Sequence, residues 1–277
     1  MKIAAVIILY NPDDDFSSNI NSYVNFIDKL YIVDNSSKKS LNNFDLLEEE
    51  KIEYIFNNEN LGIAKSLNMV ADLAIKNGYN YLLTMDQDSK FLNFEKYLNC
   101  LQNLDFHDIA IVSPNPTYDK NKSTETCEYE LVDKTITSGS ILNLSLFNKI
   151  GKFDENLFID EVDFDYCLKA RMLNYNILLF KNIHLAHSFG TVIENKNNRV
   201  QYPPIRVYYI TRNRLYMASK YSNFDKKYYG YRRSFYEAVY KKFFRILKHE
   251  DNKLLKIKAL SRGVFHFLIK RYGKYDV

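Results

Sequence analysis

The sequence predicts an α/β domain with a mixed, mostly parallel sheet flanked by helices, followed by a helical C-terminal appendage. Short apolar segments typical of buried strands alternate with amphipathic helical segments in the first part of the chain, which is the pattern of a doubly wound sheet. The 277 residues are 46% apolar, enough for one such domain with an appendage. Charge separates the two parts: residues 225–277 carry a balance of +10, and residues 1–224 one of −6. We therefore predict a main domain over residues 1–220 and a basic, aromatic-rich helical region over residues 221–277.

Each element follows from a local pattern. Ile3–Tyr10 is apolar on both faces, as in a central parallel strand, and Asn11-Pro12 ends it. Gly78 is the expected stop of a helix that begins at Ile63. Further strands are predicted at 30–33, 52–56, 79–86, 109–112, 135–143 and 177–180, and further helices at 15–28, 94–104, 146–150 and 162–174. Residues 115–130 are polar and are expected to form a loop.

The strand that ends at Asp86 is the most informative segment. Its apolar residues stop abruptly at Asp86-Gln87-Asp88, and Asp is a poor strand residue, so both carboxylates are expected at the edge where open α/β sheets bind ligands. Two nearby carboxylates repel each other, and a hard cation such as Mg²⁺ or Mn²⁺ would relieve that repulsion while water and phosphate oxygens fill its other positions. The segment favours a metal–diphosphate site; a solvated turn after a strand is the alternative.

Acidic residues gather at three predicted strand ends or helix starts, and one histidine follows later. The clusters are Asp34, Asp86 with Asp88, and Asp160-Glu161-Val162-Asp163, and the histidine is His187. Strand ends on one edge of a parallel sheet converge in space. Such an excess of carboxylates is expected to hold a cation or to provide a base with a raised pKa.

The order of these motifs resembles glycosyltransferase family 2, which has the GT-A fold. The first part of the match comprises Ile8–Asn11, Val33–Ser37, Asn60–Ala64 with Asn68, and Asp86–Asp88. The second part is similar to the rhamnosyltransferase branch and comprises Thr137–Ser140, Ile150–Glu155, Leu157–Asp163, Cys167-Leu168, Arg171, His187–Gly190 and Tyr208–Arg214. Each motif alone is weakly specific; their joint order over residues 3–220 carries the resemblance.

The resemblance implies a role for each candidate residue. The donor nucleotide would lie against Tyr10, Asn11, Asp34, Asn60, Gly62 and Asp86. A divalent metal, Mg²⁺ or Mn²⁺, would be held by Asp88, with Asp86 nearer the ribose and His187 as a further ligand or phosphate contact. Ser138, Gly139, Arg212 and Asn213 would line the cleft for the donor sugar and acceptor. The ordinary alternatives are an Asp turn at Asp34, a packed or surface His187, and a solvent-facing helix at residues 212–213.

The resemblance also implies a carboxylate base in the later acidic cluster. In an inverting transfer, the base removes the proton of the acceptor hydroxyl as its oxygen attacks the anomeric carbon. The wider family often has Glu-Asp-x-Asp here, whereas this chain has Asp-Glu-Val-Asp, so the choice between Asp160, Asp163 and Glu161 is open. We favour them in that order. Acids that favour the dipole at a helix N-terminus are the structural alternative.

The basic C-terminal region predicts attachment to a surface. Residues 225–277 alternate cations with aromatic residues, a composition that suits an anionic membrane surface and an acceptor carried on a lipid. Helices that pack on the main domain with a basic outer face are the alternative; only charge favours nucleic acid, and no nucleic acid partner is expected.

Three scattered cysteines, Cys100, Cys127 and Cys167, form no CxxC pair or metal spacing. They suit a reduced, cytoplasmic setting. No segment has the length of a membrane span or the features of a signal peptide, so we expect a peripheral location at the inner face of the membrane.

Taken together, the residues predict an inverting, metal-dependent glycosyltransferase. By resemblance, its donor would be dTDP-L-rhamnose or another dTDP- or UDP-sugar, and its acceptor a hydroxyl of a lipid-linked surface glycan. Two alternatives compete: a phosphatase of the haloacid dehalogenase type, in which Asp86 would be a covalent nucleophile, and a non-catalytic nucleotide-sugar-binding or membrane scaffold. A scaffold needs no base, and a phosphatase would carry its Asp-x-Asp after its first strand.

Overall fold

The computed structural model describes residues 1–13, 16–40, 49–116, 126–187 and 201–275. The chain divides into two compact units, Met1–Phe153 with Tyr166–Ser188, and Asp154–Asp165 with Phe189–Val277. Among the described residues, no helix is long and apolar enough to cross a membrane.

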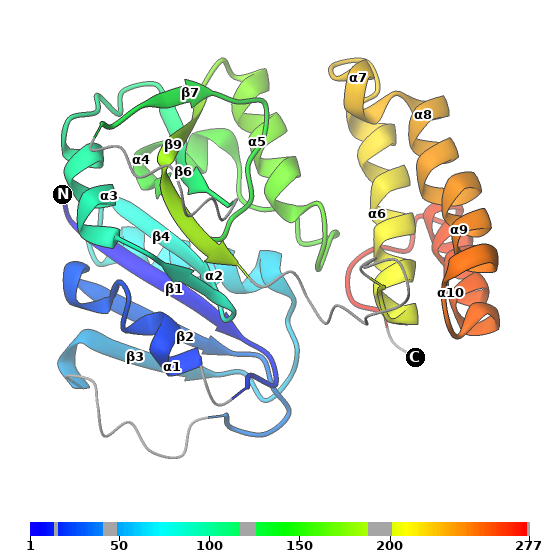
Figure 1. Ribbon diagram of the computed structural model, residues 1–277, viewed down its shortest axis with the longest axis horizontal. Helices are drawn as coiled ribbons and strands as arrows, with labels where there is room; N and C mark the ends of the chain where they lie inside the picture. The colour runs from blue at the N-terminus through cyan, green and yellow to red at the C-terminus, as the bar shows by residue number, and fades with distance from the viewer. Residues whose placement is uncertain (14–15, 41–48, 117–125, 188–200, 276–277) are drawn as a thin grey trace. The chain divides into compact units, whose positions relative to one another are not determined.

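The first unit is built on a mixed sheet. Its strands run in the order β3 (Ile52–Phe56), β2 (Lys29–Asp34), β1 (Ile3–Leu9), β4 (Tyr81–Asp86), β8 (Ser140–Asn143), β6 (Ile109–Asn115), β9 (Asn176–His187) and β5 (Ser89–Phe91), with β7 (Tyr129–Leu131) paired to β9. The first four are parallel, as the alternating pattern predicts, and can be followed from blue to cyan in Figure 1. The structure confirms the predicted mixed α/β class, because β8 runs antiparallel to both β4 and β6.

The elements with the strongest sequence patterns, β1 and the helix α2 (Ile63–Lys76), lie in the core of the first unit as predicted. Every residue of β1 is buried, as expected for a central strand. The helix α2 buries Leu67, Val70, Ala71 and Ala74 at helical spacing. It ends as predicted, with Gly78 in a left-handed conformation at φ +74°.

The described residues of this part of the chain also form the helical segments α1 (Phe16–Ile20), η1 (Val24–Phe26), η2 (Glu49–Lys51), α3 (Phe94–Gln102) and α4 (Leu144–Ile150). The helix α5 (Val162–Met172) crosses the boundary between the units. The predicted single helix over residues 15–28 is wrong, because α1 and η1 are separated. The Ser22 hydroxyl donates a 2.6 Å hydrogen bond to the Asn19 carbonyl between them, a local bond that competes with regular helix formation.

The expectation that the cysteines are reduced is wrong for two of the three. Cys100 on α3 and Cys127 before β7 form a disulfide with a Cα–Cα distance of 5.4 Å, and Cys167 is buried and takes no part in this disulfide. The sequence spacing gave no sign of this pair, because the pairing of β7 with the distant strand β9 fixes the chain near Cys127. The expected loop over residues 115–130 lies partly outside the described residues.

The second unit is helical. It contains α6 (Pro204–Tyr221), α7 (Lys226–Tyr229), α8 (Tyr231–Phe235), the π-helical segment η3 (Tyr236–Lys241), α9 (Lys242–His249) and α10 (Lys253–Leu268), drawn from yellow to red in Figure 1. The helix α10 packs along α6, and Gly263 permits the close approach, since a Cβ there would lie 2.9 Å from the Tyr208 carbonyl oxygen. The contacts group α6 with the C-terminal helices, whereas the boundary at residue 220 remains a prediction about the extent of the main domain.

Candidate functional site

Two candidate regions carry the predicted site residues, one in each unit. We call the first the strand-end edge: the carboxyl ends of β1, β2 and β4 with the residues that follow them. Register brings its acids together, since Leu9 of β1 lies opposite Asp34 and Ile8 lies opposite Asp86. The convergence predicted for these two clusters therefore exists in the structure.

Asp34 is a buried and fully engaged carboxylate. Its oxygens accept hydrogen bonds from the Ser36 amide at 2.9 Å, the Ser40 amide at 2.8 Å and the Tyr54 hydroxyl at 2.5 Å. Burial alone would raise the pKa of Asp34, but these hydrogen bonds outweigh it and hold the pKa below its ordinary value. Asp34 thus shapes the turn after β2 in its ionised form, and its contact with a nucleobase stays a prediction.

Tyr10 and Asn11 join the strand ends to one another. The Tyr10 amide donates to Gln87 Oε1 at 2.8 Å, and the Asn11 amide donates to Ser36 Oγ at 2.8 Å. The Tyr10 ring is half exposed beside Asp86-Gln87-Asp88. It is therefore available to a flat ligand at this edge.

Asn60 and Gly62 form the turn that starts α2. Asn60 Oδ1 accepts a 2.9 Å hydrogen bond from the Gly62 amide. Gly62 precedes the helix at φ +81°, a conformation that L side chains rarely adopt. The predicted turn into the helix is present.

Ser138 and Gly139 lie behind Asp86 and are buried. Ser138 Oγ accepts a 3.2 Å hydrogen bond from the Asp86 amide and donates one of 2.7 Å to Ser89 Oγ. Ser138 therefore fixes the residues on both sides of Gln87 and Asp88. Its predicted contact with the donor sugar remains a prediction.

The predicted metal ligands have a donor set that fits a hard cation. Asp86 and Asp88 supply two carboxylates at the end of β4. In the pairing of β5 with β9, His187 lies opposite Ser89, which is the residue after Asp88. Within the described ranges no group of three or more His, Cys, Asp or Glu residues is arranged to hold a metal ion. Two carboxylates suffice for Mg²⁺ when substrate phosphates and water complete its shell. The motif residues after His187 lie outside the described residues.

The second candidate region is the acidic loop, which we define as residues 154–165. Phe158, Asp160 and Glu161 all have left-handed backbones, at φ +63°, +63° and +67°. Such conformations are costly for residues other than glycine and persist only where surrounding contacts impose them. Strain of this kind is concentrated at functional sites, which supports a functional role for the loop.

The side chains of Arg212 and Asn213 impose this conformation from α6. Asn213 Nδ2 donates to the carbonyls of residues 157, 159 and 160 at 2.7–3.1 Å. Arg212 donates to the carbonyls of residues 156, 157 and 273 at 2.7–3.2 Å. Both residues are 0% exposed. These bonds support a positioning role for the pair, and the contact with the donor sugar and acceptor stays a prediction.

Asp160 differs from its neighbours in having a carboxylate oxygen without a partner. Its Oδ1 accepts hydrogen bonds from Arg206 Nε at 3.3 Å and Nη2 at 3.1 Å, whereas its Oδ2 is buried and unpaired among the described residues. Burial raises the pKa of Asp160 above its ordinary value, although Arg206 and Lys242 oppose the rise. A raised pKa and a carboxylate oxygen without a hydrogen-bond partner suit a general base.

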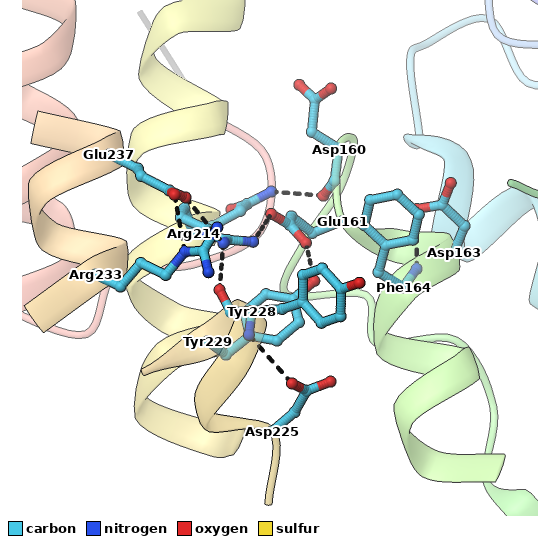
Figure 2. Close-up of polar contacts among 11 residues, drawn as sticks. Asp160, Glu161, Asp163, Phe164, Arg214, Asp225, Tyr228, Tyr229, Arg233 and Glu237 are labelled. Carbon is cyan, nitrogen blue, oxygen red and sulfur yellow. Dashed lines mark hydrogen bonds and ion pairs between the residues drawn. The ribbon is translucent and has the colours of Figure 1, made fainter. Parts of the chain in front are cut away.

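Glu161 and Asp163 are held differently. Glu161 accepts a 2.5 Å hydrogen bond from the Tyr229 hydroxyl and a 3.3 Å ion pair from Arg214. Asp163 lies in the first turn of α5 and accepts from the Phe164 amide at 2.9 Å, as an acid at a helix start does. Figure 2 shows Glu161 directed at Arg214 and Tyr229, with the Asp160 carboxylate pointing away from them. Of the three, Asp160 is best suited to accept a proton.

A partly buried ionic cluster that sequence reasoning missed anchors the two ends of the loop. Lys220 Nζ lies 2.7 Å from Asp154 Oδ2 and 2.5 Å from Asp165 Oδ1, and Tyr216 and Tyr221 donate their hydroxyls to the same two acids. Although burial alone would lower it, the pKa of Lys220 is raised by these acids. Lys220 and Tyr216 lie four residues apart on α6, but nothing in the sequence indicated which acids they meet.

The fold and these two regions define a class. The mixed, mostly parallel sheet flanked by helices is that of a GT-A glycosyltransferase, and the solved structures that match share this fold. S. aureus TarS with UDP-GlcNAc matches at a TM-score of 0.61 and 17% identity over 95% of this chain and 81% of that one. The mannosyltransferase PcManGT from Pyrobaculum calidifontis, with GDP-Man and Mn²⁺, matches at a TM-score of 0.56 and 9% identity over 98% of this chain and 88% of the other.

Residues 4–179 match Glycosyl transferase family 2, and the chain belongs to that family. It is 30% identical over 244 residues to the dTDP-rhamnosyl transferase RfbF of Shigella flexneri. The match covers 79% of this chain and 80% of that protein. The protein is therefore a glycosyltransferase of the class that uses nucleotide-sugar donors, similar to rhamnosyltransferases. This membership excludes the phosphatase and scaffold alternatives.

Proposed function

We propose that this protein transfers L-rhamnose from dTDP-L-rhamnose to a hydroxyl of a glycan acceptor, with inversion at the anomeric carbon. The similarity to the dTDP-rhamnosyl transferase RfbF supports this donor. The observation that carries the reaction is the buried, unpaired Oδ2 of Asp160 in a strained loop.

In this reaction Asp160 Oδ2 takes the proton of the acceptor hydroxyl. The hydroxyl oxygen forms the new bond to the anomeric carbon, and the bond from that carbon to the diphosphate breaks on the opposite face. Arg206 holds Oδ1 and so leaves Oδ2 for the acceptor. Arg212 and Asn213 keep the carboxylate in position through the loop backbone.

The strand-end edge would bind the donor nucleotide. Tyr10 offers an exposed ring, and the turns at Asn11, Asp34, Asn60 and Gly62 surround the ends of the parallel strands. A divalent cation held by Asp86, Asp88 and His187 would stabilise the charge that develops on the leaving diphosphate.

Donor and metal use can be tested with the purified protein. We expect calorimetric binding of dTDP in Mg²⁺ or Mn²⁺, weaker binding of UDP and GDP, and loss of binding in EDTA and in Asp88→Ala. Failure of the folded protein to bind any of the three nucleotides would contradict the assignment of the strand-end edge.

The base can be tested with Asp160→Asn. General base catalysis contributes about 10²–10⁴-fold, so the turnover of dTDP-L-rhamnose should fall by that factor while dTDP affinity is unchanged. Glu155→Gln, an exposed acid in the same loop, is the matched control and should keep its turnover. Equal activity of Asp160→Asn and the wild-type protein would eliminate Asp160 as the base.

We also propose that the acceptor is lipid-linked and that the C-terminal region rests on the anionic inner surface of the cell membrane. Tyr236, Tyr240, Phe244 and Leu247 form an apolar row along η3 and α9. They are 53, 54, 40 and 39% exposed. The centre of the Tyr240 ring lies 5.6 Å from that of Tyr236 and 4.8 Å from that of Phe244. An exposed apolar row in a region with a balance of +10 suits an anionic lipid surface.

Vesicle sedimentation tests this surface. The protein should sediment with vesicles that contain phosphatidylglycerol and less with phosphatidylcholine alone, and Tyr240→Ser with Phe244→Ser should weaken sedimentation. Equal sedimentation with both kinds of vesicle would contradict the proposal.

A further inference from the structure

A pocket beside the acidic loop collects more positive than negative charge. Its volume is about 380 Å³, within the range typical of ligand sites. Both apolar and charged residues line it: Glu161, Ile210, Arg214, Glu237, Ala238, Lys241, Lys242 and Arg245. All of them belong to the helical unit, and we call this the cationic pocket.

The two acids of the cationic pocket are already neutralised. Glu161 and Glu237 each form a 3.3 Å ion pair with Arg214, which also lies 4.4 Å from the centre of the Tyr229 ring. Glu237 accepts a second bond, of 2.9 Å, from Arg233. Arg214 therefore acts as the internal counterion of these acids, and the other cations are left to meet a ligand.

Lys242 is the most unusual of the remaining cations. It is only 8% exposed, yet no acid lies within ion-pair distance of its amine among the described residues. Its amine lies 5.1 Å from the centre of the Tyr202 ring. Burial lowers the pKa of Lys242 to about 8, with nearby Arg245 acting in the same direction, although the charges of Glu250 and Asp160 oppose the shift. A buried ammonium without a directly paired acid is costly, and an anionic ligand would relieve that cost.

Arg245 presents a second unpaired donor. Its Nε pairs with Glu250 at 2.8 Å, but its Nη2 is buried without a hydrogen-bond partner in the described part of the chain. Lys241 lines the same pocket, is exposed and has no ion pair among the described residues. Lys241, Lys242 and Arg245 could therefore bind one anion together.

The cationic pocket is linked to Asp160 through shared side chains. The centre of the Tyr202 ring lies 4.9 Å from the Arg206 guanidinium and 5.1 Å from the Lys242 amine. Arg206 is the residue that holds Asp160 Oδ1. Lys242 is also near enough to Asp160 to lower its pKa. An anion in the pocket would therefore lie close to the base in the same unit.

We propose that the cationic pocket binds a phosphate group of the acceptor and so sets the acceptor hydroxyl at Asp160. This inference rests on the proposed function, because Asp160 is its base. The phosphate could belong to the diphosphate of a lipid carrier or to a phosphodiester within the glycan. Both present the same charged oxygens to Lys242 and Arg245.

Binding of inorganic pyrophosphate tests the pocket without any donor or turnover. The full-length protein is used in EDTA with Asp88→Ala, so that the metal-dependent site is silent. We expect calorimetric binding that Lys242→Met weakens about tenfold or more, since it loses one charge-assisted contact. Lys248→Gln, an exposed lysine on α9 outside the pocket, should bind as its parent does. No binding by the parent, or equal binding by Lys242→Met, would overturn the proposal.

Kinetics then identify the source of the phosphate. Lys242→Met should raise the KM for the acceptor and leave the KM for the donor unchanged. If the phosphate belongs to the lipid carrier, the effect disappears with an acceptor glycan freed of its lipid diphosphate; if it belongs to the glycan, the effect persists. An unchanged acceptor KM with both acceptors overturns the proposal. Absence of rhamnose transfer by the wild-type protein would instead refute the proposed function, and the pyrophosphate result would still stand.

Discussion

The strand-end edge and the acidic loop are held by different forces. At the edge, parallel ladders place Asp34 and Asp86 on either side of β1, so backbone register fixes their positions. In the loop, side chains of α6 bind the carbonyls of a strained segment some fifty residues earlier in sequence. The backbone of the edge would therefore keep its conformation after loss of a single side chain, whereas the conformation of the loop depends on a few side chains of α6.

This difference has a functional meaning. A nucleotide and a metal need a fixed cradle of backbone turns, which a buried sheet supplies. A base needs one unpaired oxygen at an unusual pKa, and Asp160 is kept so by Arg206, Arg212 and Asn213. Substitutions can therefore separate donor binding from transfer.

The largest effect is expected in the loop, from Arg212→Met. Loss of the guanidinium removes a charged donor from the carbonyls of residues 156, 157 and 273, and each such hydrogen bond contributes about 1.5–3 kcal/mol. We expect the free energy of unfolding of the helical unit to fall by at least about 3 kcal/mol and transfer to fall with it. Urea unfolding followed by the pattern of amide exchange measures the first, and release of dTDP the second.

Donor binding is the control for Arg212→Met, because the strand-end edge belongs to the other unit. Calorimetric affinity for dTDP should stay as in the wild-type protein at temperatures where the variant is folded. A parallel loss of dTDP affinity would mean that the loop and the edge do not act separately.

A smaller effect is expected at the edge, from Gly139→Ala. A Cβ at this position would lie 2.7 Å from Pro114 Cγ and 3.1 Å from Leu185 Cδ2, and Gly139 has φ +78°. Overpacking and the left-handed backbone should cost about 1–3 kcal/mol in the free energy of unfolding. Because Ser138 fixes the Asp86 amide, dTDP affinity should weaken, and Asp160-dependent chemistry should not.

Gly151→Ala is the matched control, since Gly151 also has a positive φ, of +92°, but open space around it. It separates backbone strain from overpacking. If both variants lose equal stability, the close contacts of Gly139 contribute nothing and only its backbone conformation counts.

Sequence reasoning reached the edge more easily than the loop for the same physical reason. The apolar pattern of β1, β2 and β4 records strand burial, and parallel strands bring their ends together. Asp34 and Asp86 were therefore found from local sequence, as were α2 and its stop at Gly78. The antiparallel insertion of β8, the break between α1 and η1 and the pairing of Cys100 with Cys127 depend on distant contacts, which no local pattern reports.

The loop acids were also visible in the sequence, but their partners were not. Arg212 and Asn213 stood in a motif that suggested ligand contact, whereas they bind the loop backbone. Arg206 and Lys220 carried no signal, because their partners lie 46 and 55 residues away. The structure gives a physical reason to choose Asp160 over Glu161. Among the described residues Asp160 Oδ2 has no hydrogen-bond partner, whereas Glu161 accepts a hydrogen bond from Tyr229.

The smallest effect is a shift in pH dependence, from Arg206→Gln. As a base Asp160 acts ionised, so activity is lost as pH falls through its folded-state pKa, which burial holds above the ordinary value of 3.8. Arg206 lowers that pKa, and its removal should therefore move the acid limb of kcat to higher pH. The pH profile of dTDP release measures the shift.

Arg233→Gln is the control for this shift, because Arg233 pairs with Glu237 and makes no hydrogen bond to Asp160. Its acid limb should coincide with that of the wild-type protein. If Arg206→Gln lowers kcat equally at all pH values, Arg206 orients the carboxylate without tuning its proton affinity. If instead the limb moves to lower pH, the titrating group is not Asp160, and Asp163 becomes the residue to replace next.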